Sequence, residues 1–231
     1  MVAKYHDIIV NKHTEMIAFL CRVINFLEDI VEDAECSEVY VDRVKLSEMM
    51  LEFKAIGCKY DVVESTRLFS DKHGIKAELG SGDMELRKLY DRVVDYYART
   101  LRKEIKQYAI RTRETGIEYY LGVLFDGRGF IAEGEEDKVI VPGLPQCFSA
   151  HTHPSDYPMP SLRDIRVITR LLVDRGLGHV VETFGNGLAI YRTGPVSLSD
   201  YEVLLNTVKK SDVENALREM INRTVVKARF I

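Results

Sequence analysis

At residues 150–164 the sequence reads Ala150-His151-Thr152-His153-Pro154-Ser155-Asp156-Tyr157-Pro158-Met159-Pro160-Ser161-Leu162-Arg163-Asp164. The segment before it, 146–149, is short and half apolar, which is typical of a strand. Because side chains alternate between the two faces of a strand, His151 and His153 project side by side from one face. Three prolines between 154 and 160 then predict a stiff turn that ends regular strand pairing.

A helix is expected to begin after this turn. Ser161 is a suitable N-cap, and apolar residues follow it at helical spacing: Ile165, Val167, Ile168, Leu171 and Leu172. Asp164 falls in the first turn of that helix. The sequence therefore places His151 and His153 at a strand end and the carboxylate of Asp164 at the next helix start. Two imidazoles and one carboxylate suit zinc, which prefers four tetrahedral ligands and keeps one position open in catalytic sites.

Each of these signals also has a purely structural interpretation. A His-x-His pair is common on surfaces and in packed strands, so the pair alone does not establish a metal site. Ser161 and Asp164 form the pattern of a capping box, which by itself needs no metal. Capping and metal binding are compatible, however, because a carboxylate has two oxygens. The two signals together, in this order and joined by this loop, favour a metal site.

The spacing of these residues resembles a known family signature. His151-x-His153, seven residues, Ser161, two residues and Asp164 is the signature of the JAMM (MPN-plus) metalloproteases, present here without a substitution. The resemblance covers roughly residues 115–195. It implies an α/β fold whose core is a mixed-sheet MPN/JAMM-like (cytidine-deaminase-like) arrangement with helices on its faces.

The family resemblance also implies a chemistry. A Zn2+ ion would be held by His151, His153 and Asp164, and the reaction would be hydrolysis of an amide or isopeptide bond. Ser161 would donate a hydrogen bond to the developing oxyanion. A glutamate at the start of the strand that opens the domain would act as general base, and Glu118 is the best match.

The match at Glu118 is imperfect. Gly122 lies about one residue later than the glycine of the family strand, and the interval from Glu118 to His151 is short. Glu114 and Glu133 therefore remain alternatives for the general base. Cys147 is interpreted as a packing residue, and His179, on a following strand, as a core or surface residue.

The expected substrate also comes from the resemblance. Members of the family cleave after the C-terminal glycines of ubiquitin-like modifiers, and the short loops 154–160 and 185–187 look like the compact prokaryotic form. Conjugates of a ubiquitin-like or sulfur-carrier protein are therefore the expected partners. The alternative is a non-catalytic MPN-type scaffold that recruits partners through its N-terminal region. Nucleic-acid binding by the basic end of a helix at 83–113 is disfavoured, because solvated helix faces have the same composition.

The chain as a whole has an ordinary composition. It has 231 residues, 46% of them hydrophobic, and a formal net charge of -4, so no general attraction to nucleic acid or anionic membrane is expected. No apolar run approaches a membrane span, and the first residues lack a signal-peptide pattern, which favours a cytoplasmic location without a membrane partner. The four cysteines form no C-x-x-C, and they are interpreted as free thiols, with a disulfide left open.

Periodicity predicts two parts. Residues 1–110 are expected to be an all-α N-terminal region, a candidate homodimer surface, and residues 111–231 a mixed α/β metalloprotease domain. The expected helices of the first part are 14–33, 42–56, 60–73 and 83–113. The expected strands of the second part are 117–125, 129–132, 138–141, 180–184 and 188–192, with a strand or a tail at 225–231.

Overall fold

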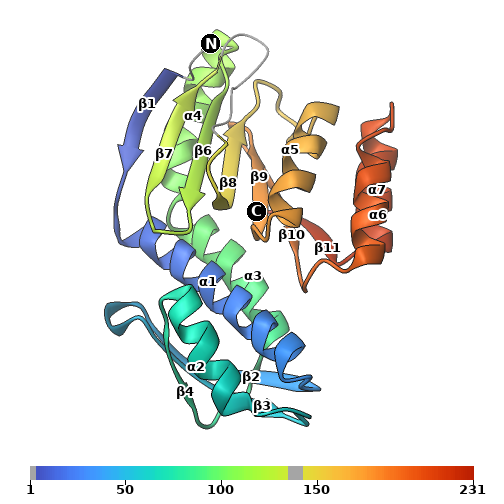
Figure 1. The fold of residues 1–231 in the computed structure, drawn as a ribbon. Helices are drawn as coiled ribbons and strands as arrows, with labels where there is room; N and C mark the ends of the chain where they lie inside the picture. The colour runs from blue at the N-terminus through green and yellow to red at the C-terminus, as the bar shows by residue number, and fades with distance from the viewer. Residues whose placement is uncertain (1–3, 135–142) are drawn as a thin grey trace.

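The protein is represented by a computed structural model that describes residues 4–134 and 143–231, and within these residues the strands form two sheets (Figure 1). The larger sheet has the order β1 (Lys4–Ile9), β7 (Gly129–Glu133), β6 (Tyr119–Leu124), β8 (Gln146–Thr152), β9 (Gly178–Glu182), β10 (Gly187–Arg192) and β11 (Val226–Phe230). The smaller sheet has the order β4 (Lys76–Leu79), β3 (Met50–Ile56), β2 (Glu38–Lys45) and β5 (Met84–Glu85). The predicted mixed α/β architecture is confirmed.

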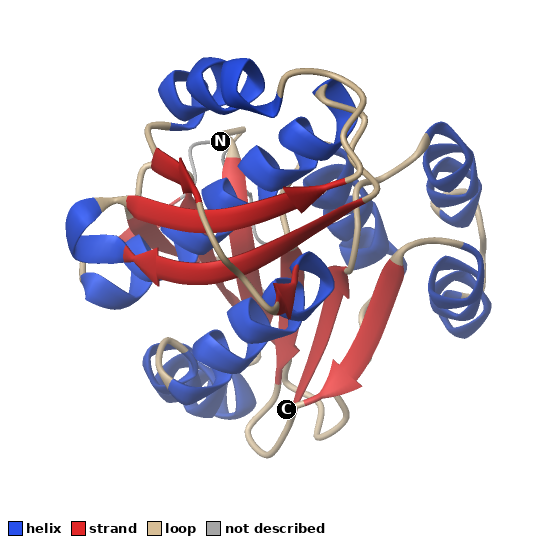
Figure 2. Cartoon of the chain, turned by 90° about the horizontal axis from the view of Figure 1, so that it is seen from below, coloured by secondary structure: helices blue, strands red, loops and turns tan. Residues whose placement is uncertain are grey.

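Helices cover both faces of the larger sheet. They are α1 (Lys12–Asp33), α3 (Leu86–Arg99), α4 (Arg102–Thr115), α5 (Leu162–Val173), α6 (Leu198–Thr207) and α7 (Val213–Arg223), whereas α2 (Val62–His73) packs on α1 and on β4 of the smaller sheet. Alternation along β10 separates two cores, because Ala189 and Tyr191 pack with α1, α3 and α4. Leu188 and Ile190, on the opposite face, pack with α5, α6 and α7. Helix α1 also packs on the smaller sheet, whose β2 and β3 run crosswise to the larger one (Figure 2).

Strand β8 has a central position in the larger sheet. It pairs antiparallel with β6, with Tyr120 opposite His151, and parallel with β9, with Ser149 opposite His179. Helix α5 makes the crossover between β8 and β9, as expected for a parallel pair. Gly122 of β6 has no room for a side chain, because a Cβ there would lie 2.4 Å from Phe130 and 2.7 Å from Gln146. The end of β8 is thus held on both sides by paired strands.

The prediction of an all-α N-terminal region is wrong. Strand β1 lies at the edge of the larger sheet, and most of 42–56 is strand rather than helix, with a short 3-10 turn, η1 (Leu46–Glu48), between β2 and β3. Val39, Val41, Leu51 and Phe53 are buried, and their neighbours along the strands are more exposed. The sequence analysis predicted a helix here because the segment is rich in leucine, methionine, glutamate and lysine. These residues have high intrinsic helix propensity, and they made the strand period of two hard to recognise. Helices near 14–33 and 60–73 are confirmed as α1 and α2.

The helix expected at 83–113 is two helices, because the chain breaks at Thr100. Its apolar period continues across the break, so periodicity alone could not reveal it. The expected strand at 138–141 lies outside the described residues. The C-terminal segment is a strand, β11, and not a tail, and the N-caps before α6 and α7 are Ser197 and Asp212.

The cysteines do not all stay free thiols. Cys36 and Cys58 form a disulfide bond, whereas Cys21 and Cys147 are free and buried. The interpretation of four free thiols is therefore wrong for one pair, which spacing alone could not identify. Across the described part of the chain, no helix combines the length and the apolar character that crossing a bilayer needs.

Candidate metal centre

Three ionisable side chains meet where β8 ends and α5 begins. Nε2 of His151 lies 3.4 Å from Oδ2 of Asp164, and Nε2 of His153 lies 3.3 Å from the same oxygen. The two imidazole rings are 4.7 Å apart between centroids and nearly perpendicular. The alternation of β8 and the turn that leads to α5 bring these groups together, as the sequence predicted.

The spacing suits a metal ion that is held by all three groups. In a tetrahedral site with bonds of about 2.0–2.1 Å, neighbouring ligand atoms lie about 3.3–3.4 Å apart. The two distances to Asp164 have these values. Nε2 of His151 is moreover a buried atom without a hydrogen-bond partner. A buried ring nitrogen without a partner costs free energy, and a metal ion at this position would satisfy it.

Glu118 also lies beside the imidazoles. It immediately precedes β6, and its Oε1 is 3.7 Å from Nε2 of His153. One ligand atom from each of Glu118, His151 and His153 lies within 4.8 Å of the other two, so this trio could also hold an ion. Asp164 is closer to both imidazoles than Glu118 is to His153, and we therefore take Asp164 as the third ligand and Glu118 as the neighbouring carboxylate.

The environment of Glu118 favours its protonated form. Burial raises the pKa of this carboxyl group, and the imidazoles of His151 and His153 only partly oppose that effect. The two alternative glutamates lie elsewhere. Glu133 accepts a hydrogen bond from the Tyr119 hydroxyl at 3.3 Å, and Glu114 is exposed near the end of α4.

Asp164 combines two roles in the structure. Its Oδ2 accepts a hydrogen bond from the Ser161 backbone N–H at 2.6 Å, and Ser161 Oγ accepts one from the Asp164 N–H at 3.2 Å. This is the predicted capping box. Burial disfavours the charged carboxylate, but the imidazoles of His151 and His153 beside it outweigh burial and hold the pKa of Asp164 well below its ordinary value. Accepting the capping bond leaves the hydroxyl proton of Ser161 available for donation.

His179 is the residue that sequence reasoning missed. Its Nε2 lies 2.5 Å from Nδ1 of His151, and its Nδ1 lies 2.6 Å from Oγ of Ser149. The ring is 1% exposed, and burial lowers its pKa well below the ordinary value, so it is neutral. The sequence did contain one signal for this contact. A strand, a helix and a second strand in succession predict a parallel strand pair, and in such a pair a side chain of the second strand lies beside Ser149 and His151 of β8.

Other expected features have internal partners. Arg102, one of the cations assigned to a basic helix face, donates to Glu182 at 2.9 Å. Lys106 donates to the carbonyl oxygens of Phe184 and Gly185 at 2.8 and 2.9 Å. Cys147 is fully buried in the core that includes α1, consistent with packing. The basic face thus has fewer free cations than its sequence suggests.

A cavity of about 720 Å³ lies beside α5, lined in part by Tyr120, Gln146 and Val167. Its lining includes none of His151, His153 and Asp164. The cavity is therefore separate from the candidate metal centre, although Tyr120 is opposite His151 on the paired strand.

Comparison of the chain with known protein families, with curated proteins and with solved structures finds no match. The assignment of a chemistry therefore rests on the geometry of this centre and on the signature in the sequence.

Proposed function

We propose that this protein is a zinc-dependent hydrolase of amide or isopeptide bonds, of the JAMM type. One observation carries the proposal: Nε2 of His151 and Nε2 of His153 lie 3.4 and 3.3 Å from a single oxygen of Asp164. Two imidazoles and a carboxylate at this spacing form a three-ligand set that leaves one tetrahedral position open. When bound there, zinc would supply Lewis acidity and lower the pKa of a coordinated water toward about 7.

The remaining steps are assigned to residues of the chain. Glu118 accepts a proton from the attacking water and delivers it to the leaving amine, a task that suits a carboxyl group whose pKa is raised. Ser161 donates its hydroxyl proton to the developing oxyanion. The expected substrate is the amide bond after the C-terminal glycines of a ubiquitin-like or sulfur-carrier protein, since the signature resembles that family.

The decisive experiment combines metal content with cleavage. Zinc-loaded protein is incubated with a fusion in which a Gly-Gly tail precedes the scissile amide, and cleavage is followed beside the Glu118→Gln variant. We expect Glu118→Gln to bind zinc like the original protein and to cleave about 10²–10⁴ times more slowly, because it cannot carry the proton. Glu114→Gln, an exposed glutamate on α4, is the matched control and should cleave normally.

The other outcomes are also informative. Undiminished cleavage by Glu118→Gln would show that another group moves the proton. Zinc binding without cleavage of any fusion would contradict the proposed substrate class. A purified chain that takes up no zinc would contradict the hydrolase and favour the scaffold that recruits partners through its N-terminal region.

A further inference from the structure

We infer that His179 is a positioning residue that fixes which nitrogen of His151 is free to bind the metal. The inference rests on the proposed function, because it concerns the metal site defined there. His179 lies between His151 on one side and Ser149 on the other, with all three side chains buried. Neither of the two contacts needs an ion, so they describe how the chain itself prepares the site.

Metal binding requires one particular tautomer of His151. Its Nε2 faces Asp164, and this nitrogen can coordinate only when it carries no proton. In a neutral imidazole the proton must then reside on Nδ1 and needs an acceptor. The nitrogen 2.5 Å from Nδ1 is Nε2 of His179. His179 must therefore present a bare Nε2 and carry its own proton on Nδ1.

Ser149 supplies the acceptor for that proton. Nδ1 of His179 is 2.6 Å from Ser149 Oγ, and a serine hydroxyl can accept a hydrogen bond at this distance.

Donation from His151 Nδ1 to His179, and from His179 Nδ1 to Ser149 Oγ, leaves Nε2 of His151 without a proton. This agrees with the finding that Nε2 of His151 is a buried atom without a hydrogen-bond partner.

A dedicated partner of this kind has a measurable effect on a metal site. Partners of the non-coordinating nitrogen of a ligand histidine typically contribute about 10–100-fold to metal affinity. His179→Phe keeps an aromatic ring but removes the acceptor. His179→Gln offers an amide oxygen that can accept from His151 Nδ1. The two variants separate the hydrogen bond from the volume of the side chain.

The test measures zinc affinity and the tautomer of His151 in the full chain. Affinity is obtained by competition with a chromophoric chelator, and the tautomer by long-range proton–nitrogen NMR of the metal-free protein at about pH 8.5, above the ordinary imidazole pKa near 6.5. We expect the proton of His151 on Nδ1. We expect His179→Phe to lower zinc affinity about 10–100-fold and His179→Gln to stay within about threefold of the original value.

Ser149→Ala is a smaller change that keeps the test valid if the Phe variant does not fold. It removes the acceptor for His179 and should also lower zinc affinity, with part of the His151 population shifting its proton to Nε2. A proton on Nε2 of His151 in the original chain would overturn the inference, as would unchanged affinity in folded His179→Phe. Failure of the original chain to bind zinc would instead contradict the proposed function. A failure of this inference can therefore be distinguished from a failure of the proposed function.

Discussion

At the scale of single residues, one oxygen of Asp164 has two roles: it caps helix α5 and it faces the two imidazoles. Its Oδ2 accepts from the Ser161 amide at 2.6 Å and also faces the two imidazoles. A capping role alone would explain the first contact but not the burial of an unpartnered His151 nitrogen beside it. The two tasks can be separated by substitution, because an amide oxygen can cap a helix but is a much weaker metal ligand than a carboxylate.

Asp164→Asn should therefore lose zinc affinity while keeping most of its stability. We expect affinity to fall by more than about tenfold, since even the loss of an outer hydrogen-bond partner costs about that much. Ser161→Ala is the matched control, because it removes the cap and should lower the unfolding free energy of the metal-free protein by about 1 kcal/mol with zinc affinity retained. Chelator competition and urea unfolding measure the two quantities. Equal zinc affinity in Asp164→Asn and the original chain would show that Asp164 only caps the helix and is not a metal ligand.

The residues of the centre show what a sequence can and cannot predict. His151, His153 and Asp164 are close in sequence, so strand alternation and helix capping were enough to bring them together. Glu118 is 33 positions before His151, and only a family resemblance suggested it. Periodicity alone did not assign His179, because its role depends on which strand lies next to β8, and periodicity does not specify strand order.

At the scale of elements, residues on both sides of the break between α3 and α4 contact β9, the strand beside the site. Tyr97, just before the break, donates to Oε1 of Glu182 at 3.1 Å, and Arg102, just after it, donates to the same oxygen at 2.9 Å. Glu182 is fully buried at the end of β9, and its backbone oxygen accepts from the His153 N–H at 2.7 Å. The two helices thus hold the segment that supports His153.

Because of these contacts, removing the Arg102 side chain should lower the stability of the protein. Arg102→Met leaves a buried carboxylate without its cation, and we expect the unfolding free energy to fall by about 3–5 kcal/mol. Lys103→Met is the control on the same helix, where an exposed side chain should change stability by less than about 0.5 kcal/mol. Urea unfolding measures both, and adding Glu182→Gln to Arg102→Met should recover part of the loss. Equal small effects of the two methionine variants would contradict a structural role for the pair.

The mispredicted elements follow from the same physics. The segment 42–56 contains strong helix formers, and only its position beside α1 makes strand pairing more favourable there. The break at Thr100 could not be predicted from periodicity, because the apolar period continues across it. Segments with a single, long and unbroken period, such as α1 and α5, were predicted correctly because no tertiary contact opposes their local preference.

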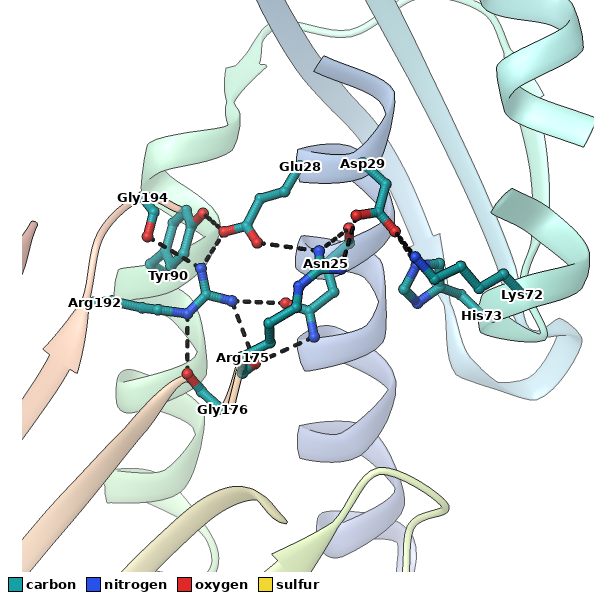
Figure 3. A network of polar contacts seen from close by, with 10 residues as sticks. All are labelled: Asn25, Glu28, Asp29, Lys72, His73, Tyr90, Arg175, Gly176, Arg192 and Gly194. Carbon is teal, nitrogen blue, oxygen red and sulfur yellow. Dashed lines mark hydrogen bonds and ion pairs between the residues drawn. The ribbon is translucent and has the colours of Figure 1, made fainter. Parts of the chain in front are cut away.

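At the scale of the whole molecule, α1 connects the two sheets through a buried polar network (Figure 3). Glu28 pairs with Arg192 of β10 and accepts from the Tyr90 hydroxyl of α3. Asp29, one position later, pairs with groups of α2 on the side of the smaller sheet. The Arg192 side chain is 2% exposed. Because an uncompensated charge would be expensive here, the network favours one relative placement of the sheets.

His73 makes this connection sensitive to pH. Its Nε2 lies 2.7 Å from Oδ2 of Asp29, but Lys72 and Arg175 already pair with that carboxylate at 2.8 and 2.7 Å. Burial lowers the pKa of His73, and the nearby carboxylate does not overcome this effect. The folded ring therefore stays neutral in a range where the ring of the unfolded chain, with a pKa near 6.5, takes up a proton. The unfolded state then binds more protons, so stability falls as pH falls.

His73→Gln should remove this contribution. The amide can still donate to Asp29, but it does not titrate, so the variant should lose less stability than the original chain between about pH 7.5 and 5.5. Urea midpoints and slopes at each pH, measured on metal-free protein, provide the comparison, and the titration of the other histidines cancels in the difference between the two proteins. The sign of the stability difference between the two proteins as the pH falls distinguishes a lowered from a raised pKa of His73. If His73 were instead charged and paired with Asp29, its pKa would be raised, and the original chain would gain stability relative to His73→Gln as the pH falls.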